Sequence, residues 1–157
     1  MEEKIGQRHH PDNQVGSSEN DNAQSFGARP SDCSKRILVV EDNLVNYKIV
    51  SRFLNKWGFE HANAENGVEA LKMMETECYA LALMDLHMPL MDGYETTRQI
   101  RAHEDSRKAN LPIIAFSADA VAEIQQKASE AGINGFANKP FKPAELHAEI
   151  ERLIASR

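Results

Sequence analysis

The sequence predicts an α/β fold in which five parallel strands form one sheet with helices on both faces. From residue 35 to the end of the 157-residue chain, short apolar runs alternate with segments whose apolar residues recur at helical spacing. Glycine, proline or Asn-Gly turns separate these segments, so the connections are short, as in consecutive βαβ units.

Five runs predict the strands. The first, third and fourth runs are apolar throughout, which is typical of strands that helices cover on both sides. The third run ends at Asp85. The predicted strands are residues 36–40, 59–64, 79–84, 111–116 and 135–137.

A helix is predicted after each strand. Gly58 and Gly132 end the first and fourth helices, Asn66-Gly67 precedes the second, and Pro143 suits the first turn of the last. Right-handed crossovers leave few topologies, of which the flavodoxin-like order 2-1-3-4-5 is usual at this size. The apolar residues that predict these helices are Val45, Ile49, Val50, Phe53, Leu54 and Trp57; Val68, Leu71 and Met74; Tyr94, Thr97 and Ile100; Val121, Ile124 and Ala128; and Leu146, Ile150, Leu153 and Ile154.

The apolar residues are unevenly distributed, which sets the predicted domain boundary. Residues 1–34 contain few large apolar side chains and cannot bury enough surface to offset their ordering entropy, so we expect a disordered tail or linker. His9-His10 has no nearby partner ligands for a metal site. Residues 35–157 are predicted to form one folded domain.

Charge and composition limit the classes of function. The net charge of −6 argues against direct nucleic-acid binding, and no apolar run has the roughly 20 residues that a bilayer requires. Cys33 and Cys78 lack metal-ligand spacing and are too few for a disulfide framework. We therefore expect reduced cysteines and a cytoplasmic protein without direct membrane contact.

Polar side chains follow the predicted strands where each strand ends. Glu41 and Asp42 follow the first strand, Asp85 the third and Ser117 the fourth, while Lys139 follows the fifth. Because the carboxyl ends of parallel strands lie at one edge, these groups should converge there. A hard divalent cation relieves repulsion between close carboxylates, and Mg²⁺ leaves positions for water and a phosphoryl oxygen. The sequence thus predicts a magnesium-dependent phosphoryl site.

Four segments, ILVVEDN, LALMDLHMPLMDGYE, IIAFSAD and FANKPF, resemble those of the receiver domain of two-component response regulators. The resemblance covers residues 35–157 and is strongest to receivers attached to hybrid sensor histidine kinases. It implies that Asp85 accepts a phosphoryl group from a phosphohistidine. It also implies that Asp42 binds Mg²⁺ directly with Asp85, that Glu41 acts through metal-bound water, and that the backbone carbonyl of His87 completes the ligands.

The same resemblance implies roles for residues of the last two strands. Ser117 matches the switch hydroxyl, Phe136 the switch aromatic residue and Lys139 the phosphate-binding lysine, while Pro140 matches a Lys-Pro bond that is frequently cis. Phe136 stands where tyrosine is also common, so only ring packing can signal. The implied partners are the dimerisation and phosphotransfer domain of a histidine kinase and a histidine phosphotransfer protein, with the domain itself a monomer or weak homodimer.

The expected role is a signalling switch or relay that catalyses only its own phosphorylation and dephosphorylation. One rival is a small magnesium-dependent phosphatase with an aspartyl-phosphate intermediate, which needs a second acid at position 87, where this chain has histidine. Another is a flavin-binding module, which needs hydroxyl- and glycine-rich phosphate loops. The sequence leaves open whether the domain stands alone or belongs to a hybrid kinase.

Overall fold

The computed structural model, which describes residues 30–119 and 121–157, contains one sheet of five parallel strands. The strand order is β2-β1-β3-β4-β5, which confirms the predicted topology. The strands are β1 (Arg36–Val40), β2 (Glu60–Ala64), β3 (Leu81–Asp85), β4 (Ile113–Ser117) and β5 (Gly135–Asn138). The helices are α1 (Leu44–Lys56), α2 (Gly67–Thr76), α3 (Gly93–Arg101), α4 (Ser106–Ala109), α5 (Ala122–Ala131) and α6 (Pro143–Ala155), preceded by the 3₁₀ helix η1 (Pro30–Lys35).

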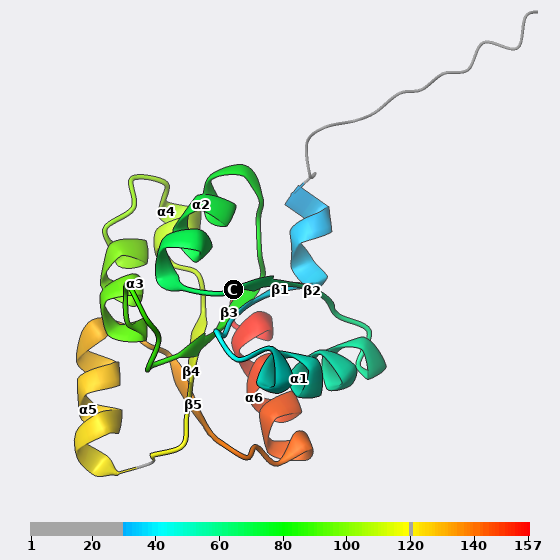
Figure 1. The fold of residues 1–157 in the computed structure, drawn as a ribbon. Coiled ribbons are helices and arrows are strands. Elements are labelled where there is room, and N and C mark those ends of the chain that lie inside the picture. The colour runs from blue at the N-terminus through cyan, green and yellow to red at the C-terminus, as the bar shows by residue number, and fades with distance from the viewer. Residues whose placement is uncertain (1–29, 120) are drawn as a thin grey trace, which may run out of the picture.

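Helices cover both faces of the sheet, so the central strands are buried on both sides (Figure 1). On one face, α1 and α6 contribute Leu54 and Ile150 to a core cluster that includes Leu83 of β3. On the other face, α2 and α3 pack Met74 and Ile100 against β1, β3 and β4, and α5 adds a smaller cluster. This three-layer arrangement leaves the two ends of the strands as the surfaces where loops gather.

Local sequence signals account for the helix boundaries. The side chains of Asn43, Asn66 and Asp92 accept hydrogen bonds from backbone N–H groups at the starts of α1, α2 and α3. Gly132 ends α5 with a φ of 102°, a left-handed conformation that favours glycine. Pro143 begins α6, as predicted.

The structure departs from the predicted helices in two places. The short helix α4 was not predicted, because four residues are too few to show an apolar period; Asp105 caps it. Val45 and Ile49, assigned to the apolar pattern of α1, are 65% and 48% exposed. That helix therefore presents two kinds of apolar surface, one buried against the sheet and one open to solvent.

The predicted tail lies largely outside the described residues, which include neither His9-His10 nor any residue before Pro30. Residues 30–34, the last part of the predicted tail, belong to the 3₁₀ helix η1. Among the described helices, none has both the length and the apolar character needed to cross a membrane.

The expectation that Cys33 and Cys78 stay unpaired is wrong in this structure, which joins them in a disulfide. Both residues lie three positions before a strand, Cys33 before β1 and Cys78 before β3. These strands are parallel neighbours, and Ile37 pairs with Leu81. The pairing of these strands would set Cys78 opposite Ser34, and the 3₁₀ helix η1 brings the adjacent Cys33 to a Cα–Cα distance of 5.3 Å from Cys78, although 45 positions separate the two cysteines. Spacing alone missed this pair because the contact arises from strand order.

Candidate functional site

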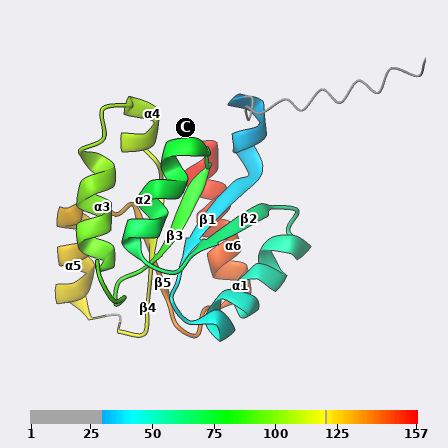
Figure 2. The same ribbon diagram turned by 45° about the horizontal axis from the view of Figure 1, so that its top comes forward.

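The register of the sheet gathers the predicted site residues at the carboxyl edge. Val40 pairs with Met84, so the residues that follow, Glu41 and Asp85, are neighbours at the ends of β1 and β3. Ser117 pairs with Asn138, which places Lys139 just beyond the next strand end. These ends lie together beside the start of α1, at the bottom of Figure 2.

Three acidic side chains form a compact cluster at this edge. Carboxylate oxygens of Glu41, Asp42 and Asp85 lie within 4.8 Å of one another. Glu41 and Asp85 are 3% and 6% exposed, whereas Asp42 is open to solvent. The backbone N–H of Asn43 donates to Glu41 Oε1 at 3.0 Å, which orients that carboxylate. The cluster is thus held by the fold on one side and reached by water on the other.

Lys139 bridges two of these carboxylates. Its Nζ lies 2.6 Å from Glu41 Oε2 and 3.2 Å from Asp85 Oδ2. The Phe116 ring lies beneath it, with Nζ 5.2 Å from the ring centroid. The Lys139–Pro140 peptide bond is cis, as the resemblance implied. The ammonium group therefore lies between the two buried carboxylates of the cluster.

The electrostatics of the site favour an added cation. Burial is the main reason that the pKa of Glu41 is raised, with repulsion from Asp85 adding to it and hydrogen bonds from Lys139 and Asn43 opposing it. Three carboxylates and one ammonium leave an excess of negative charge. Carboxylate oxygens accept hydrogen bonds and bind hard divalent cations, so the residues present fit Mg²⁺.

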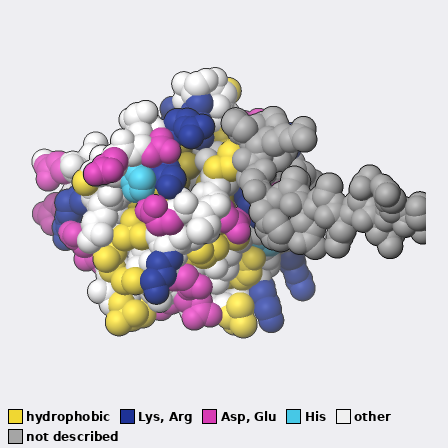
Figure 3. Space-filling view, turned by 90° about the horizontal axis from the view of Figure 1, so that it is seen from above, with side chains coloured by type: hydrophobic (Ala, Val, Ile, Leu, Met, Phe, Trp, Pro, Cys, Tyr) yellow, Lys and Arg dark blue, Asp and Glu magenta, His cyan; other side chains and the backbone are white. Residues whose placement is uncertain are grey.

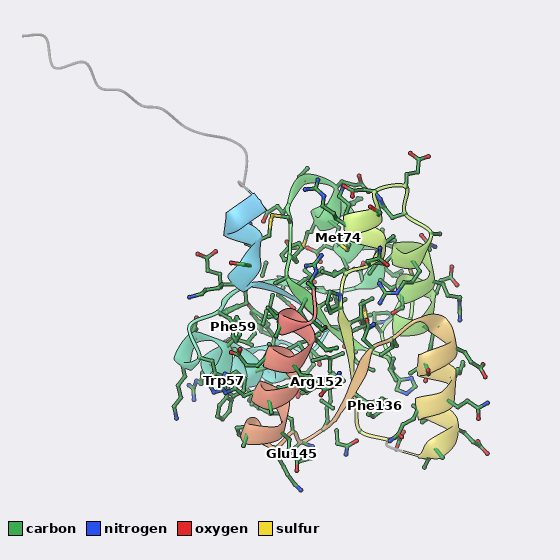
Figure 4. The ribbon with its side chains drawn as sticks, turned by 180° about the vertical axis from the view of Figure 1, so that it is seen from behind. Trp57, Phe59, Met74, Phe136, Glu145 and Arg152 are labelled. Atoms are coloured by element: carbon green, nitrogen blue, oxygen red, sulfur yellow. A yellow bond between two sulfur atoms is a disulfide. The ribbon has the colours of Figure 1, made fainter. Side chains whose placement is uncertain are left out.

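Ser117 and Phe136 lie on the neighbouring strands β4 and β5. Ser117 is 1% exposed, and its Oγ accepts a hydrogen bond from the backbone N–H of Asp119 at 3.2 Å. The half-buried Phe136 packs against the cluster containing Leu86 and Tyr94, and Figure 4 shows it on β5 beside α5. The structure thus places a hydroxyl at the site edge and an aromatic ring between the sheet and the α3–α5 face.

His87 occupies the position at which the phosphatase alternative needs a second acid. Its side chain is exposed, and its backbone N–H donates to Asp85 Oδ1 at 3.0 Å. The residue thus orients Asp85 through its backbone. It supplies no second carboxylate of the kind that the phosphatase alternative requires.

Two contacts around the site were missed by sequence reasoning. Phe116 was assigned only to the core, yet its ring faces Lys139. Gly93 was treated as loop punctuation, but a Cβ on it would lie 2.3 Å from the backbone oxygen of Asp85. The glycine after Asp92 at the start of α3 was a usable signal for such a close approach, whereas nothing in the local sequence marked Phe116.

Comparison with known proteins agrees with this geometry. Residues 37–151 match the family model described as response regulator receiver domain. The chain is 33% identical over 153 residues to "Probable histidine kinase 6" of Oryza sativa subsp. japonica, covering 87% of this chain and 16% of that protein. It is 37% identical over 132 residues to "Hybrid signal transduction histidine kinase B" of Dictyostelium discoideum, covering 78% and 7%. The chain thus spans less than a fifth of these relatives.

Solved structures extend the comparison. The receiver domain of sensor histidine kinase PA1611 from Pseudomonas aeruginosa PAO1, which holds a magnesium ion in its active site cleft, matches with a TM-score of 0.71 and 37% identity over 77% of this chain and 98% of that one. The Ssk1 receiver domain of Saccharomyces cerevisiae, crystallised with the phosphotransfer protein Ypd1, gives 0.68 and 31% over 73% and 85%. On the family match, the sheet topology and these likenesses together, the chain belongs to the response regulator receiver domains of two-component systems.

Proposed function

We propose that this domain accepts a phosphoryl group on Asp85 from the phosphohistidine of a histidine kinase and then changes conformation or passes the group to a histidine phosphotransfer protein. The observation that carries the proposal is the placement of Lys139 Nζ 3.2 Å from Asp85 Oδ2, beside an acidic cluster that suits a divalent cation. Complexes such as Ypd1 with the Ssk1 receiver support the relay.

The side chains of the site divide the work of the transfer. An Asp85 oxygen attacks phosphorus in line as the bond to the histidine nitrogen breaks, and the His87 N–H holds the carboxylate in place. Lys139 shifts from Glu41 toward the incoming phosphoryl oxygens and neutralises their charge. Mg²⁺, when bound through Asp42, Asp85, the His87 carbonyl and water held by Glu41, supplies further positive charge.

The switch follows from the same contacts. A phosphoryl group on Asp85 attracts the hydroxyl of Ser117, which can donate to a phosphoryl oxygen as well as accept from the Asp119 N–H. Movement of Ser117 leaves space that the ring of Phe136 fills, which biases the β5 and α5 region toward a second conformation. The domain therefore acts as a signalling switch that modifies only itself, and we place it in the cytoplasm.

An exposed apolar patch next to the site gives the partner a surface to bind. The patch comprises Leu44, Val45 and Ile49 on α1, which are 57%, 65% and 48% exposed. Helix α1 begins two residues after Asp42, so a protein bound there reaches the acidic cluster. Grouped exposed apolar side chains are typical of protein interaction sites. We assign this patch to the domain that carries the phosphohistidine.

Phosphorylation by a small donor tests the acceptor. With Mg²⁺ and acetyl phosphate, the protein should gain one phosphoryl group that hydroxylamine removes, and beryllofluoride should bind only when Mg²⁺ is present. Asp85→Ala should not be labelled, whereas Asp119→Ala, with an exposed side chain near the site, should be labelled normally. Equal labelling of Asp85→Ala and wild type would refute the assignment.

A variant of the α1 patch separates docking of the partner from the chemistry at Asp85. Ile49→Glu should slow transfer from a phosphohistidine protein about tenfold or more and leave labelling by acetyl phosphate unchanged, because only the protein donor uses the patch. Val121→Glu, at a similarly exposed position before α5, is the matched control.

Ser117→Ala should fold but show smaller beryllofluoride-induced chemical-shift changes at Phe136. Unchanged shifts would disprove coupling through the hydroxyl.

A further inference from the structure

The disulfide between Cys33 and Cys78 lies at the amino-terminal edge of the sheet, opposite the acidic cluster. It joins η1 to the loop between α2 and β3, and Figure 4 draws it as a yellow bond beside η1. Both half-cystines are only half-buried, so the bond is not sealed inside the core. It is the point at which the chain preceding β1 is covalently fixed to the domain.

A cavity of about 460 Å³ opens beside this disulfide, and both half-cystines line it. Its volume lies within the range of small-molecule sites. Met74, Leu111 and Ile154 supply apolar walls. In the space-filling view from above, on the side of α2 and α4, basic side chains lie next to hydrophobic ones (Figure 3).

Positive charge exceeds negative charge in the cavity wall although the whole chain carries −6. The basic residues that line it are Arg107, Lys108 and Arg157, and the acidic ones are Glu77 and Asp105. Glu77 pairs with Arg36, and Asp105 lies 3.7 Å from Arg107. Lys108 lies 3.5 Å from Glu75, which does not line the cavity, and Arg157 donates to backbone oxygens. An anionic ligand with an apolar portion suits such a wall better than a cation does.

We propose that the Cys33–Cys78 pair is a reversible redox site, reduced and oxidised through this cavity by an anionic low-molecular-weight thiol of the glutathione class. Structural disulfides are rare in the reducing cytoplasm, where those that form are usually transient. The assignment does not depend on Asp85 or on phosphorylation. Its consequence is local: reduction frees η1 from the α2–β3 loop and leaves the strand ends that hold the acidic cluster unchanged.

The exchange balances in two steps. A glutathione thiolate attacks the sulfur of one half-cystine, the S–S bond breaks, and the other cysteine leaves as a thiolate. A second glutathione thiolate then attacks the glutathione sulfur of the mixed disulfide, which frees the first cysteine and forms oxidised glutathione. Two electrons pass from the two glutathione thiols to the protein disulfide, and the two thiol protons end on the cysteines.

Two measurements on the full chain test the proposal. Reduced protein incubated with oxidised glutathione should lose two hydrogen atoms in mass and both alkylatable thiols, while Cys33→Ser should stop at a mixed disulfide on Cys78. Rates of reduction are then compared for glutathione and for neutral 2-mercaptoethanol. The variant Arg107→Gln/Lys108→Gln should slow reduction by glutathione about threefold or more at low salt and leave the rate with 2-mercaptoethanol unchanged.

A control variant and two outcomes decide the result. Lys48→Gln/Arg52→Gln removes two positive charges from the exposed part of α1, away from the cavity, and should leave both rates unchanged. Failure of oxidised glutathione to close the Cys33–Cys78 bond overturns the redox site. Equal slowing with both thiols, or no slowing with glutathione, overturns entry of an anionic thiol through the cavity.

Discussion

Replacing Asp85 by asparagine should stabilise the metal-free domain, although it destroys the proposed phosphoacceptor. The change removes one negative charge and keeps the shape of the side chain. Asparagine Oδ1 can still accept the hydrogen bond from the His87 N–H, and Lys139 keeps its contact with Glu41. The stability difference therefore reports mainly the charge interactions of Asp85.

The magnitude follows from the distances in the site. At an effective dielectric constant of about 20, the 3.2 Å contact of Asp85 with Lys139 is worth about 5 kcal/mol of attraction. Repulsion of Asp85 by Glu41 and Asp42, at 4.8 Å or less, costs about 3.5 kcal/mol each and about 7 kcal/mol together. The balance favours the neutral side chain by about 2 kcal/mol. Because Asp42 is exposed, water reduces its share, and we expect about 1–2 kcal/mol.

Melting curves near neutral pH, with EDTA and with excess Mg²⁺, measure this difference. In EDTA the Asp85→Asn variant should melt about 3–8 °C above wild type for a domain of this size. Mg²⁺ should raise the wild-type midpoint more than that of the variant, since the wild type binds the ion better. The exposed Asp119→Asn is the matched charge control and should not shift the midpoint. A variant less stable than wild type in EDTA would refute the account of Asp85 as a member of a repulsive cluster.

Three other substitutions are tested by urea unfolding, two beside the site and one, Arg101→Met, at the amino-terminal edge of the sheet. Lys139→Met leaves Glu41 and Asp85 without their shared cation and should lower the free energy of unfolding in EDTA by about 3 kcal/mol. Mg²⁺ should restore part of this stability, and a loss that Mg²⁺ does not reduce would contradict the prediction. Gly93→Ala should lower the free energy of unfolding by about 2–3 kcal/mol, because the added Cβ meets the Asp85 backbone oxygen. Gly58→Ala is the control, since position 58 faces open space and carries only the strain of a φ of 83°. A smaller loss for Gly93→Ala than for Gly58→Ala would count against the close approach. Arg101→Met should cost about 3 kcal/mol, since the guanidinium donates to three backbone oxygens between Ala109 and Gly132, and a near-neutral result would show that water replaces it.

The candidate site was largely predictable because its residues are tied to strand ends. Once β1, β3, β4 and β5 were located, parallel pairing placed Glu41, Asp85, Ser117 and Lys139 at one edge without any coordinates. What pairing could not give is the direction of each side chain. The bridge from Lys139 to both carboxylates places its Nζ over the Phe116 ring, a contact that no local pattern reveals.

The surface of α1 shows a second limit of sequence reasoning. Val45, Ile49 and Val50 follow one apolar pattern, yet only Val50 is buried. A pattern tells which residues are apolar, whereas the face that the helix turns toward the sheet decides which of them are buried. The exposed members are the ones that we assign to partner binding.

The pairing of β1 with β3 brings residues of the two strands' flanks close together at both ends of the sheet, but only one of the two contacts was predicted. The neighbouring strands β1 and β3 bring Glu41 beside Asp85 where they end and Cys33 beside Cys78 before they begin. Carboxylates at strand ends carry a recognisable motif, so the first pairing was expected, whereas two isolated cysteines carry none. The register that pairs Glu41 with Asp85 would set Cys78 opposite Ser34, one position from Cys33, so strand order brings the cysteines near each other and η1 brings Cys33 into bonding distance. Because the two pairs share β1 and β3 but lie at opposite ends of them, a change in the disulfide can alter the position of η1 while the edge that holds the acidic cluster keeps its geometry.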